Sequence, residues 1–99
     1  MRKNYKLLPL AQADFRSILH YIGRDNIVAA ERMRELFYYA FRRLGVNPYI
    51  GQEREDLTDK AVRFLVVYHN YMIIYKADTN PVQILRIYNS AQNIDSILH

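Results

Sequence analysis

The spacing of apolar residues predicts two helices in the first half of the chain. Apolar positions recur every three or four residues through Leu10–Arg24 and again through Ile27–Leu44, which is typical of helices that bury one face. Asn26 or Asp25 can cap the second helix and Gly45 can end it, so we expect an antiparallel hairpin. The expected buried positions are Ala11, Phe15, Ile18, Leu19 and Ile22, followed by Met33, Leu36, Phe37, Ala40 and Leu44.

The second half of the chain has the pattern of strands. Apolar, mostly β-branched and aromatic residues fill Val62–His69, Tyr71–Ala77 and Val82–Tyr88, with turn residues between these runs. Such runs predict neighbouring antiparallel strands. Strict alternation would place Arg63, Leu65, Val67 and His69 on one face of their strand, and Ile84, Arg86 and Tyr88 on one face of theirs.

Together these elements predict an α+β fold. A short N-terminal strand at Tyr5–Leu8 ends at Pro9, and the helical hairpin packs on a mainly antiparallel sheet of three to four strands. The segment Gln52–Lys60 is polar and is predicted to link the helices to the sheet. Both faces of the sheet are largely apolar, so we expect helices on one face and another segment over part of the other. Ninety-nine residues predict a single domain spanning 1–99.

Composition narrows the classes of function. The chain has no cysteine and three scattered histidines, so we expect neither a metal site nor a cofactor. No apolar run is long enough to cross a membrane or to form a signal peptide, which predicts a cytoplasmic protein. The net charge of +4 and pI of about 9.5 favour an anionic partner, but the basic residues form no dense block. Nine tyrosines indicate a surface that binds another protein.

A ribonuclease site is one chemical hypothesis. Metal-free RNA cleavage needs a base, an acid and cations beside the phosphate. Arg63 and Arg86 could supply the cations, and Tyr88 or His69 could transfer a proton, but no residue is well placed as the base. The alternative for both arginines is structural: each would cover the sheet and pair with a carboxylate such as Asp14 or Asp56.

A binding surface is the second hypothesis. The apolar side chains of Leu65, Val67 and Tyr88, on the sheet face left open by the helices, could be covered by a peptide that folds on binding. Tyr39 lies opposite the buried side of its helix. It could contact a partner there, but an aromatic side chain that merely lies along the surface is the alternative that its position favours. The sequence therefore favours binding over catalysis.

Order and spacing of particular residues point to a family. The residues concerned are Tyr5–Leu7 with Pro9, then Ala11, Asp14, Phe15, Ile18, Tyr21, Ile22, Ala29 and Ala30, then Pro48 with Gly51, Asp56–Leu57, Val62–Arg63, Tyr68–Tyr75 and Ile84–Tyr88. Together they resemble the RelE/ParE superfamily of bacterial type II toxins, closer to ParE than to RelE. The end of the chain departs from that family, which usually has a histidine, two small residues and Arg-Asp after the last strand. Here Asn89, Ser90–Ala91 and Gln92–Asn93 stand at those places.

The resemblance implies a toxin that poisons DNA gyrase by protein contact and without catalysis. It also implies a cognate antitoxin, ParD-like or other, whose flexible C-terminal part wraps the toxin and whose N-terminal part binds DNA. Two alternatives stay open: a RelE-like mRNA endonuclease acting on the ribosome, and a non-toxic member that only binds. The residues predicted to contact target or antitoxin are Tyr39, Arg63, Leu65, Val67, Arg86, Tyr88, Gln92 and Asn93.

Overall fold

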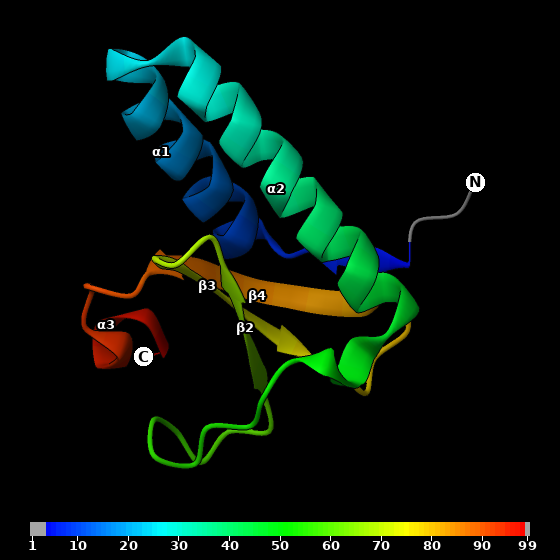
Figure 1. The fold of residues 1–99 in the computed structure, drawn as a ribbon. Helices are drawn as coiled ribbons and strands as arrows, with labels where there is room; N and C mark the ends of the chain where they lie inside the picture. Colours follow the sequence, from blue (N-terminus) through cyan, green and yellow to red (C-terminus); the bar gives the residue numbers. More distant parts are fainter. Residues whose placement is uncertain (1–3, 99) are drawn as a thin grey trace.

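Two long helices cover one face of a four-stranded sheet, and a short third helix lies on the other face (Figure 1). The computed structural model describes residues 4–98. The predicted α+β fold is confirmed. The elements in chain order are β1 (Tyr5–Leu7), α1 (Pro9–Asp25), α2 (Ile27–Val46), the 3-10 turn η1 (Pro48–Ile50), β2 (Arg63–Val67), β3 (Tyr71–Lys76), β4 (Val82–Asn89) and α3 (Ile94–Leu98).

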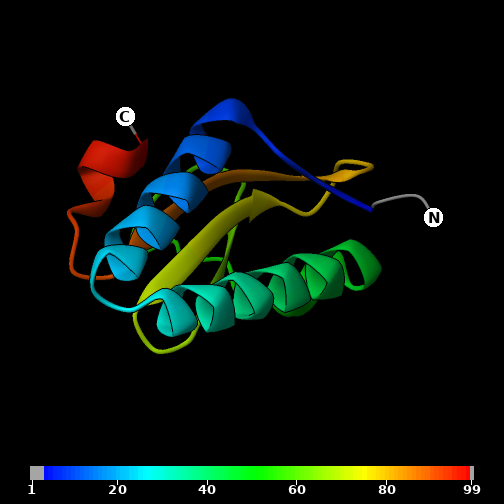
Figure 2. The same ribbon diagram turned by 90° about the horizontal axis from the view of Figure 1, so that it is seen from above.

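A single residue connects the two long helices. The backbone N–H of Asn26 donates to the carbonyl of Ile22 and so ends α1, and its side-chain oxygen accepts from the N–H of Ala29 at 3.0 Å and so caps α2. Of the two predicted caps, Asn26 is the one observed. So short a connection folds α2 back beside α1, and Figure 2 shows the two helices diverging from this tip across the sheet.

Gly45 does not end α2 as predicted. The helix continues to Val46, and among residues 4–98 no glycine has a positive φ. A methyl group at Gly45 would instead lie 2.8 Å from the Cβ of Asn4, where the chain enters β1. Glycine at this position thus allows a close approach between α2 and the first strand.

The sheet is mixed, with the order β1-β4-β3-β2. β2, β3 and β4 form the predicted antiparallel meander, whereas β1 runs parallel to β4 and pairs with its first half. Because β1 ends at Leu7, no strand within residues 4–98 pairs with the outer edge of β4 beyond Ile84. At this edge the N–H of Ile87 donates to the Asp14 carboxylate of α1.

A β-bulge in β4 changes which residues share a face. Tyr75 pairs with Ile84 and Ile74 pairs with Arg86, so Leu85 is the extra residue. Ile84 therefore points toward the helices, while Arg86 lies on the side of Ile74. The predicted face of Ile84, Arg86 and Tyr88 is wrong for Ile84, because the strict two-residue alternation is broken at the bulge.

The core under the helices is built around aromatic rings. Phe15 of α1 packs edge-on against Phe37 and Phe41 of α2, with ring centroids 5.4 and 5.5 Å apart. Phe41 is fully buried, whereas Leu36, predicted to be buried, is 40% exposed. The other predicted stripe positions of α2 are buried, so the buried face of the helix is turned toward Phe41 and away from Leu36.

A second, smaller core lies on the other face of the sheet. α3 supplies the cover that the sequence predicted without identifying, because Ile94, Ile97 and Leu98 pack there together with Leu57 and Leu85. The cluster they cover consists of Val62, Phe64, Met72, Ile74 and Tyr88. The five-residue helix α3, together with Leu57 and Leu85, thereby removes these five side chains from water.

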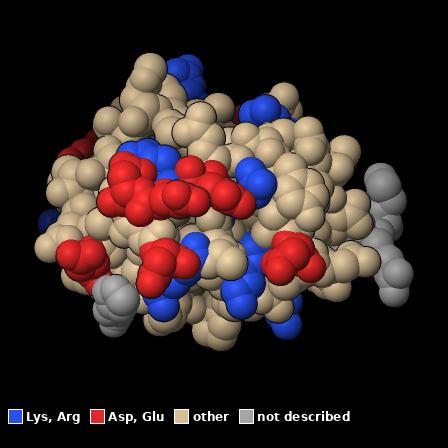
Figure 3. Space-filling view, turned by 90° about the horizontal axis from the view of Figure 1, so that it is seen from below, with Lys and Arg blue, Asp and Glu red and all other residues tan. Residues whose placement is uncertain are grey.

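The linker from Gln52 to Lys60 lies below the sheet (Figure 1) and joins it through an isolated bridge between Gln52 and Phe64. This linker contains Glu53, Glu55, Asp56 and Asp59, four of the ten carboxylates of the chain. Acidic side chains are accordingly prominent on the face seen from below (Figure 3). The segment that contains the two long helices carries more basic than acidic side chains.

The Tyr75 hydroxyl holds the η1 loop against the sheet. It accepts a hydrogen bond from the N–H of Gly51 at 2.8 Å and donates one to the carbonyl of Pro48 at 2.6 Å. Burial raises the pKa of Tyr75, so the hydroxyl stays neutral and keeps its proton for this bond. A Cβ at Gly51 would lie 2.5 Å from the hydroxyl oxygen and 2.8 Å from the carbonyl oxygen of Phe64.

We predict that Gly51→Ala lowers the free energy of unfolding by about 2 kcal/mol, because the added methyl group overpacks this site. The matched control is Gly23→Ala on α1, where the nearest atom to the added Cβ is 3.5 Å away. Alanine there favours the helix by about 0.5 kcal/mol. Urea denaturation of both variants measures the difference, and equal stabilities would contradict the packing described here.

Candidate functional site

The predicted site residues do not form one site. Tyr39 lies on α2, Arg63 at the start of β2 beside η1, Arg86 and Tyr88 on β4 with Gln92 and Asn93 just after it, His69 in the β2–β3 turn, and Leu65 and Val67 beneath the helices.

Arg86 is held by a carboxylate on α1. Its Nε and Nη2 atoms donate to the two oxygens of Asp14 at 2.8 and 3.0 Å, and Nη1 donates to the carbonyl of Ile97 on α3 at 2.9 Å. The same Asp14 carboxylate accepts the N–H of Ile87 at 3.0 Å, on the edge of β4 that β1 leaves open. The hydrogen bonds that Arg86 donates to Asp14 raise the pKa of Arg86. Of the two roles weighed for Arg86, the structural pairing with Asp14 is the one observed.

Tyr88 lies inside the second core. Its side chain is 5% exposed, and burial raises its pKa above the usual tyrosine value, an effect that nearby Arg54 partly offsets. A phenol in this environment is a weaker proton donor than one in water. Tyr88 is therefore poorly suited both to proton transfer and, while α3 is in place, to contact with a partner.

The amides after β4 build the turn that leads into α3. The side-chain oxygen of Gln92 accepts the N–H of Asn89 at 2.9 Å, and that of Asn93 accepts the N–H of Asp95 at 3.0 Å. The side-chain oxygen of Asn89 in turn accepts the N–H of Ala91. Both Gln92 and Asn93 are exposed, so they stay accessible to a partner while their oxygens hold the turn.

Arg63 has a more open position than Arg86. Its Nη1 donates to the carbonyl of Gly51 at 2.8 Å, its Nη2 lies 3.5 Å from Glu53, and its guanidinium lies 5.0 Å from the centre of the Tyr49 ring. Glu53 is largely exposed, so this ion pair is weak. Asp56, the second carboxylate proposed for the arginines, pairs with Arg54 instead, at 2.8 Å.

The four ribonuclease candidates do not converge on one phosphate. Arg63 starts β2 and His69 follows its other end, which places them roughly 20 Å apart along the strand. His69 is exposed in a turn with φ of 59°, and its ring lies against that of Tyr68. Arg86 is bound by Asp14 of α1, at the edge of β4 that β1 leaves open. This arrangement provides no base, acid and cation within reach of a single ribose.

Leu65 and Val67 were predicted to lie on an uncovered face, and this prediction is wrong. Val67 is 5% exposed within the core beneath the helices, and Leu65 packs against that core. The alternation itself was correct, but it cannot tell which face the helices cover. The exposed neighbour is Val66, 57% exposed on the face of the second core.

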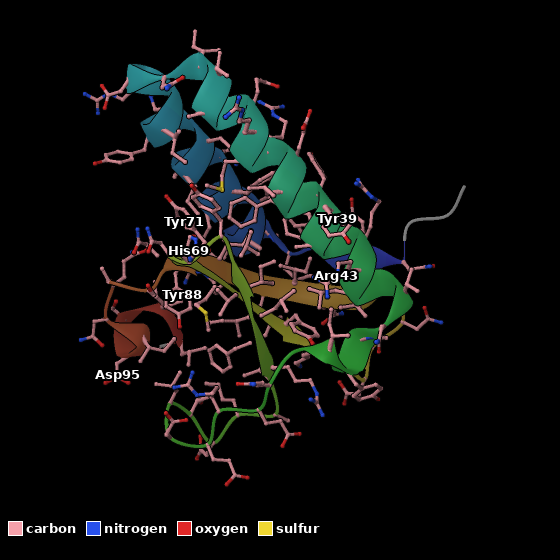
Figure 4. All side chains as sticks on the ribbon, in the orientation of Figure 1. Tyr39, Arg43, His69, Tyr71, Tyr88 and Asp95 are labelled. Carbon is pink, nitrogen blue, oxygen red and sulfur yellow. The ribbon has the colours of Figure 1, made fainter. Side chains whose placement is uncertain are left out.

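Tyr39 has the surroundings of a protein-binding residue. It is 57% exposed, and the guanidinium of Arg43 lies 5.7 Å from its ring centre (Figure 4). Beside it is a shallow hollow of about 340 Å³, here named the α2–η1 hollow and lined by Tyr39, Arg42, Arg43, Val46, Asn47 and Ile50. Sequence reasoning missed Arg43 and Val46, although they follow Tyr39 by four and seven residues and so share its helix face.

Within residues 4–98, no three acidic or histidine side chains gather as a metal site would require. None of the helices described here is long and apolar enough to span a membrane.

Comparison with known proteins identifies the family. The family model of the ParE toxin of the type II toxin–antitoxin system, parDE, matches residues 5–94. The chain belongs to the ParE toxin family. A chain in a solved structure of the chromosomal ParDE toxin–antitoxin system from P. aeruginosa has the same fold, with a TM-score of 0.70 and 22% identity over 86% of this chain and 92% of that one. No curated protein sequence matches.

The match to ParE confirms the resemblance inferred from the order of elements, and this ParE-family chain is a toxin of the type II class. The matched region extends to residue 94 and so includes the turn built by Asn89, Gln92 and Asn93. The pair of Arg86 and Asp14 also lies within it. Asp14 was among the residues that carried the resemblance, and its contacts with β4 and Arg86 give it a structural role.

We predict that Asp14→Asn lowers the free energy of unfolding by about 2 kcal/mol, because it leaves the Arg86 guanidinium without its charged partner at a site less than a quarter exposed. Urea denaturation followed by circular dichroism measures this change. Asp56→Asn is the control, because it removes the same charge from an exposed arginine pair. Equal midpoints for the two variants would show that the Asp14 contact adds nothing to stability.

Proposed function

We propose that this toxin inhibits DNA gyrase by binding to it, without breaking a covalent bond. Its action is held in check by a cognate antitoxin, ParD-like or other, whose N-terminal part binds DNA. Membership of the ParE toxin family supports the proposal. The observation that carries it is that the residues considered for ribonuclease chemistry lie apart from one another. Arg86 is bound by Asp14, and His69 lies at the far end of β2 from Arg63.

The α2–η1 hollow is the surface we assign to the gyrase contact. Residues that dominate binding energy at protein interfaces are most often tyrosine, tryptophan and arginine. Here Tyr39 and Arg43 stand side by side at an apolar hollow bordered by Val46, which is 80% exposed. Burying these groups against a partner would remove apolar surface from water and bring an arginine to an acidic or carbonyl group.

The test of gyrase inhibition uses purified toxin with purified gyrase. Negative supercoiling of relaxed plasmid should stop, and cleaved DNA should accumulate when the reaction is quenched with detergent. Induced expression of the toxin in cells should give the same DNA damage. A reconstituted translation mixture containing the toxin should yield intact mRNA. Cleaved transcripts there, with normal supercoiling, would favour the RelE-like endonuclease, and normal growth on induction would favour the non-toxic alternative.

Tyr39→Ala should weaken gyrase inhibition by about 30-fold, equivalent to about 2 kcal/mol of binding energy at a central contact residue. The concentration of toxin that halves supercoiling activity is the measurement. Tyr21→Ala is the matched control, because Tyr21 is a 70% exposed tyrosine on α1 outside the hollow, and its removal should change inhibition by less than about twofold. Equal losses in both variants would remove the hollow from the gyrase interface.

Arg63→Ala tests the endonuclease alternative. That hypothesis has two candidate cations, Arg63 and Arg86. Within residues 4–98 the one carboxylate paired with Arg63 is Glu53, which is largely exposed, so Arg63 is the cation more available to a phosphate. The variant should keep its gyrase inhibition and its toxicity, because Arg63 does not line the α2–η1 hollow and the Tyr75 hydroxyl still holds the η1 loop against the sheet. Loss of toxicity in a variant with an unchanged circular dichroism spectrum would instead support phosphate binding by Arg63.

A further inference from the structure

Helix α2 carries apolar side chains on two opposite sides. One side packs into the core through residues such as Met33, Phe37 and Leu44. Yet five of the ten large apolar side chains that are exposed within residues 4–98 also belong to α2, namely Ile27, Val28, Leu36, Tyr39 and Val46. A helix that is apolar all round is normally covered all round. Figure 2 shows the outer side of α2 turned away from the sheet and from α1, so the described chain does not itself supply the cover.

Six exposed positions on this outer side follow a heptad spacing. They begin at Val28, are separated by alternating steps of four and three residues, and end at Val46. With about 3.6 residues per turn, all six lie within about 80° of the helix circumference, on the side opposite Phe37. This is the spacing at which one helix packs along another. We call these positions the α2 seam: Val28, Arg32, Glu35, Tyr39, Arg42 and Val46.

Half of the seam is charged, and these charges have no close partner of opposite sign. Within residues 4–98, no carboxylate lies within 4 Å of Arg32 or Arg42, and no basic side chain lies that close to Glu35. Charged residues at the packing positions of paired helices set the choice of partner, because a like charge opposite them is costly. The seam therefore selects its partner by charge as well as by shape.

A second copy of this chain is a poor match to the seam. An antiparallel pair of complete seams would place Arg32 of each copy opposite Arg42 of the other. A parallel pair would oppose Arg32, Glu35 and Arg42 each to itself. Antiparallel pairs shifted by one heptad avoid these repulsions but leave a third of each seam uncovered. Like-charge repulsion thus disfavours pairing of the seam with itself.

A nucleic acid is a poor match as well. Glu35 lies between the two arginines of the seam, and the exposed Glu31 lies one turn before it, so phosphates would be repelled there. Val28 and Val46, at the two ends, have side chains that cannot hydrogen-bond to a phosphate or a base. A protein helix with apolar and charged positions of its own matches the whole length of the seam.

We propose that the α2 seam docks along a helix of gyrase whose surface has the complementary pattern. That helix would carry apolar residues opposite the three apolar positions, acidic residues opposite the two arginines and a basic residue opposite Glu35. The proposal rests on the proposed function and extends it, since Tyr39, Arg42 and Val46 also line the α2–η1 hollow. The two acidic residues would stand about 15 Å apart, which is the rise from Arg32 to Arg42.

The seam can first be tested without gyrase, with a synthetic helical peptide of about three heptads labelled with fluorescein. The peptide is designed to pair antiparallel with the seam, and it has leucines opposite the apolar positions, glutamates opposite the two arginines and a lysine opposite Glu35. Fluorescence anisotropy should show binding to the full chain with a Kd below about 100 μM. A peptide with these three charges inverted should bind at least about tenfold more weakly.

An exchange of charges tests the pairing of individual residues. Arg32→Glu should weaken binding of the first peptide by about tenfold, and a peptide with lysine in place of the glutamate opposite position 32 should restore it. Arg16→Glu is the matched control, because Arg16 is an exposed arginine of α1 outside the seam. It should change binding by less than about threefold, and the second peptide should not compensate for it. Circular dichroism melting of both variants excludes unfolding as the cause of a loss.

The same two variants connect the seam to gyrase. Arg32→Glu should raise the concentration of toxin that halves supercoiling activity by about tenfold, and Arg16→Glu by less than about threefold. Wild-type inhibition by Arg32→Glu would refute docking through the seam and leave gyrase as the target. A wild-type toxin that binds the peptide but leaves supercoiling unchanged would refute the gyrase proposal, and with it gyrase as the partner of the seam. The two failures are therefore distinguishable.

Other results would also overturn the assignment. These are the absence of peptide binding below about 100 μM, equal losses in Arg32→Glu and Arg16→Glu, or no recovery with the exchanged charge. Sedimentation equilibrium that shows a dimer of the wild-type chain, dissociated by Arg32→Glu, would assign the seam to a second copy. Displacement of the peptide by a short DNA duplex that binds more tightly would assign it to a nucleic acid.

Discussion

The contact between Asp14 and Arg86 links three parts of the molecule that are far apart in sequence. One carboxylate on α1 satisfies the open edge of β4, through the N–H of Ile87, and also binds the arginine whose remaining donor reaches α3. The helical layer, the sheet and the C-terminal helix therefore depend on one hydrogen-bonded pair that is about four-fifths buried. Because each of its three guanidinium nitrogens donates to a protein oxygen, this arginine stabilises the fold. The same geometry thus supports both the architecture and a toxin that acts by binding.

The sequence predicted most elements because the signals that define them are local. Helical spacing located α1 and α2 to within two residues, and turn residues separated the strands correctly. The faces of β4 could not be predicted, since the bulge at Leu85 is set by pairing with β3 and leaves no local mark. α3 was missed because five residues are too few for a periodic pattern, and its stability comes from the core it covers.

The candidate site was less predictable than the fold, because it depends on contacts between distant residues. The sequence allowed two roles for Arg86, a cation that binds phosphate and a structural partner of a carboxylate. The contact with Asp14 joins residues 72 positions apart, so only the structure could select the structural role. For Arg63 the partner is Glu53, which was not proposed. Leu65 and Val67 were correctly predicted to share one face of β2. Periodicity cannot say, however, which face of the strand meets the helices. Tyr39 was correctly placed on the exposed side of its helix, and its neighbours Arg43 and Val46 follow from the same helical spacing.

The separation of charge between the helical layer and the acidic linker below the sheet gives this toxin an electric dipole. In the field of an anionic macromolecule such a body rotates before it touches, so that collisions occur mostly with the helices in front. Encounters would then be fast in dilute buffer and slower as counterions shorten the range of the field. The arginine-rich side would thus meet any acidic surface first, and the orientation of the first collision is set by the distribution of charge along the chain.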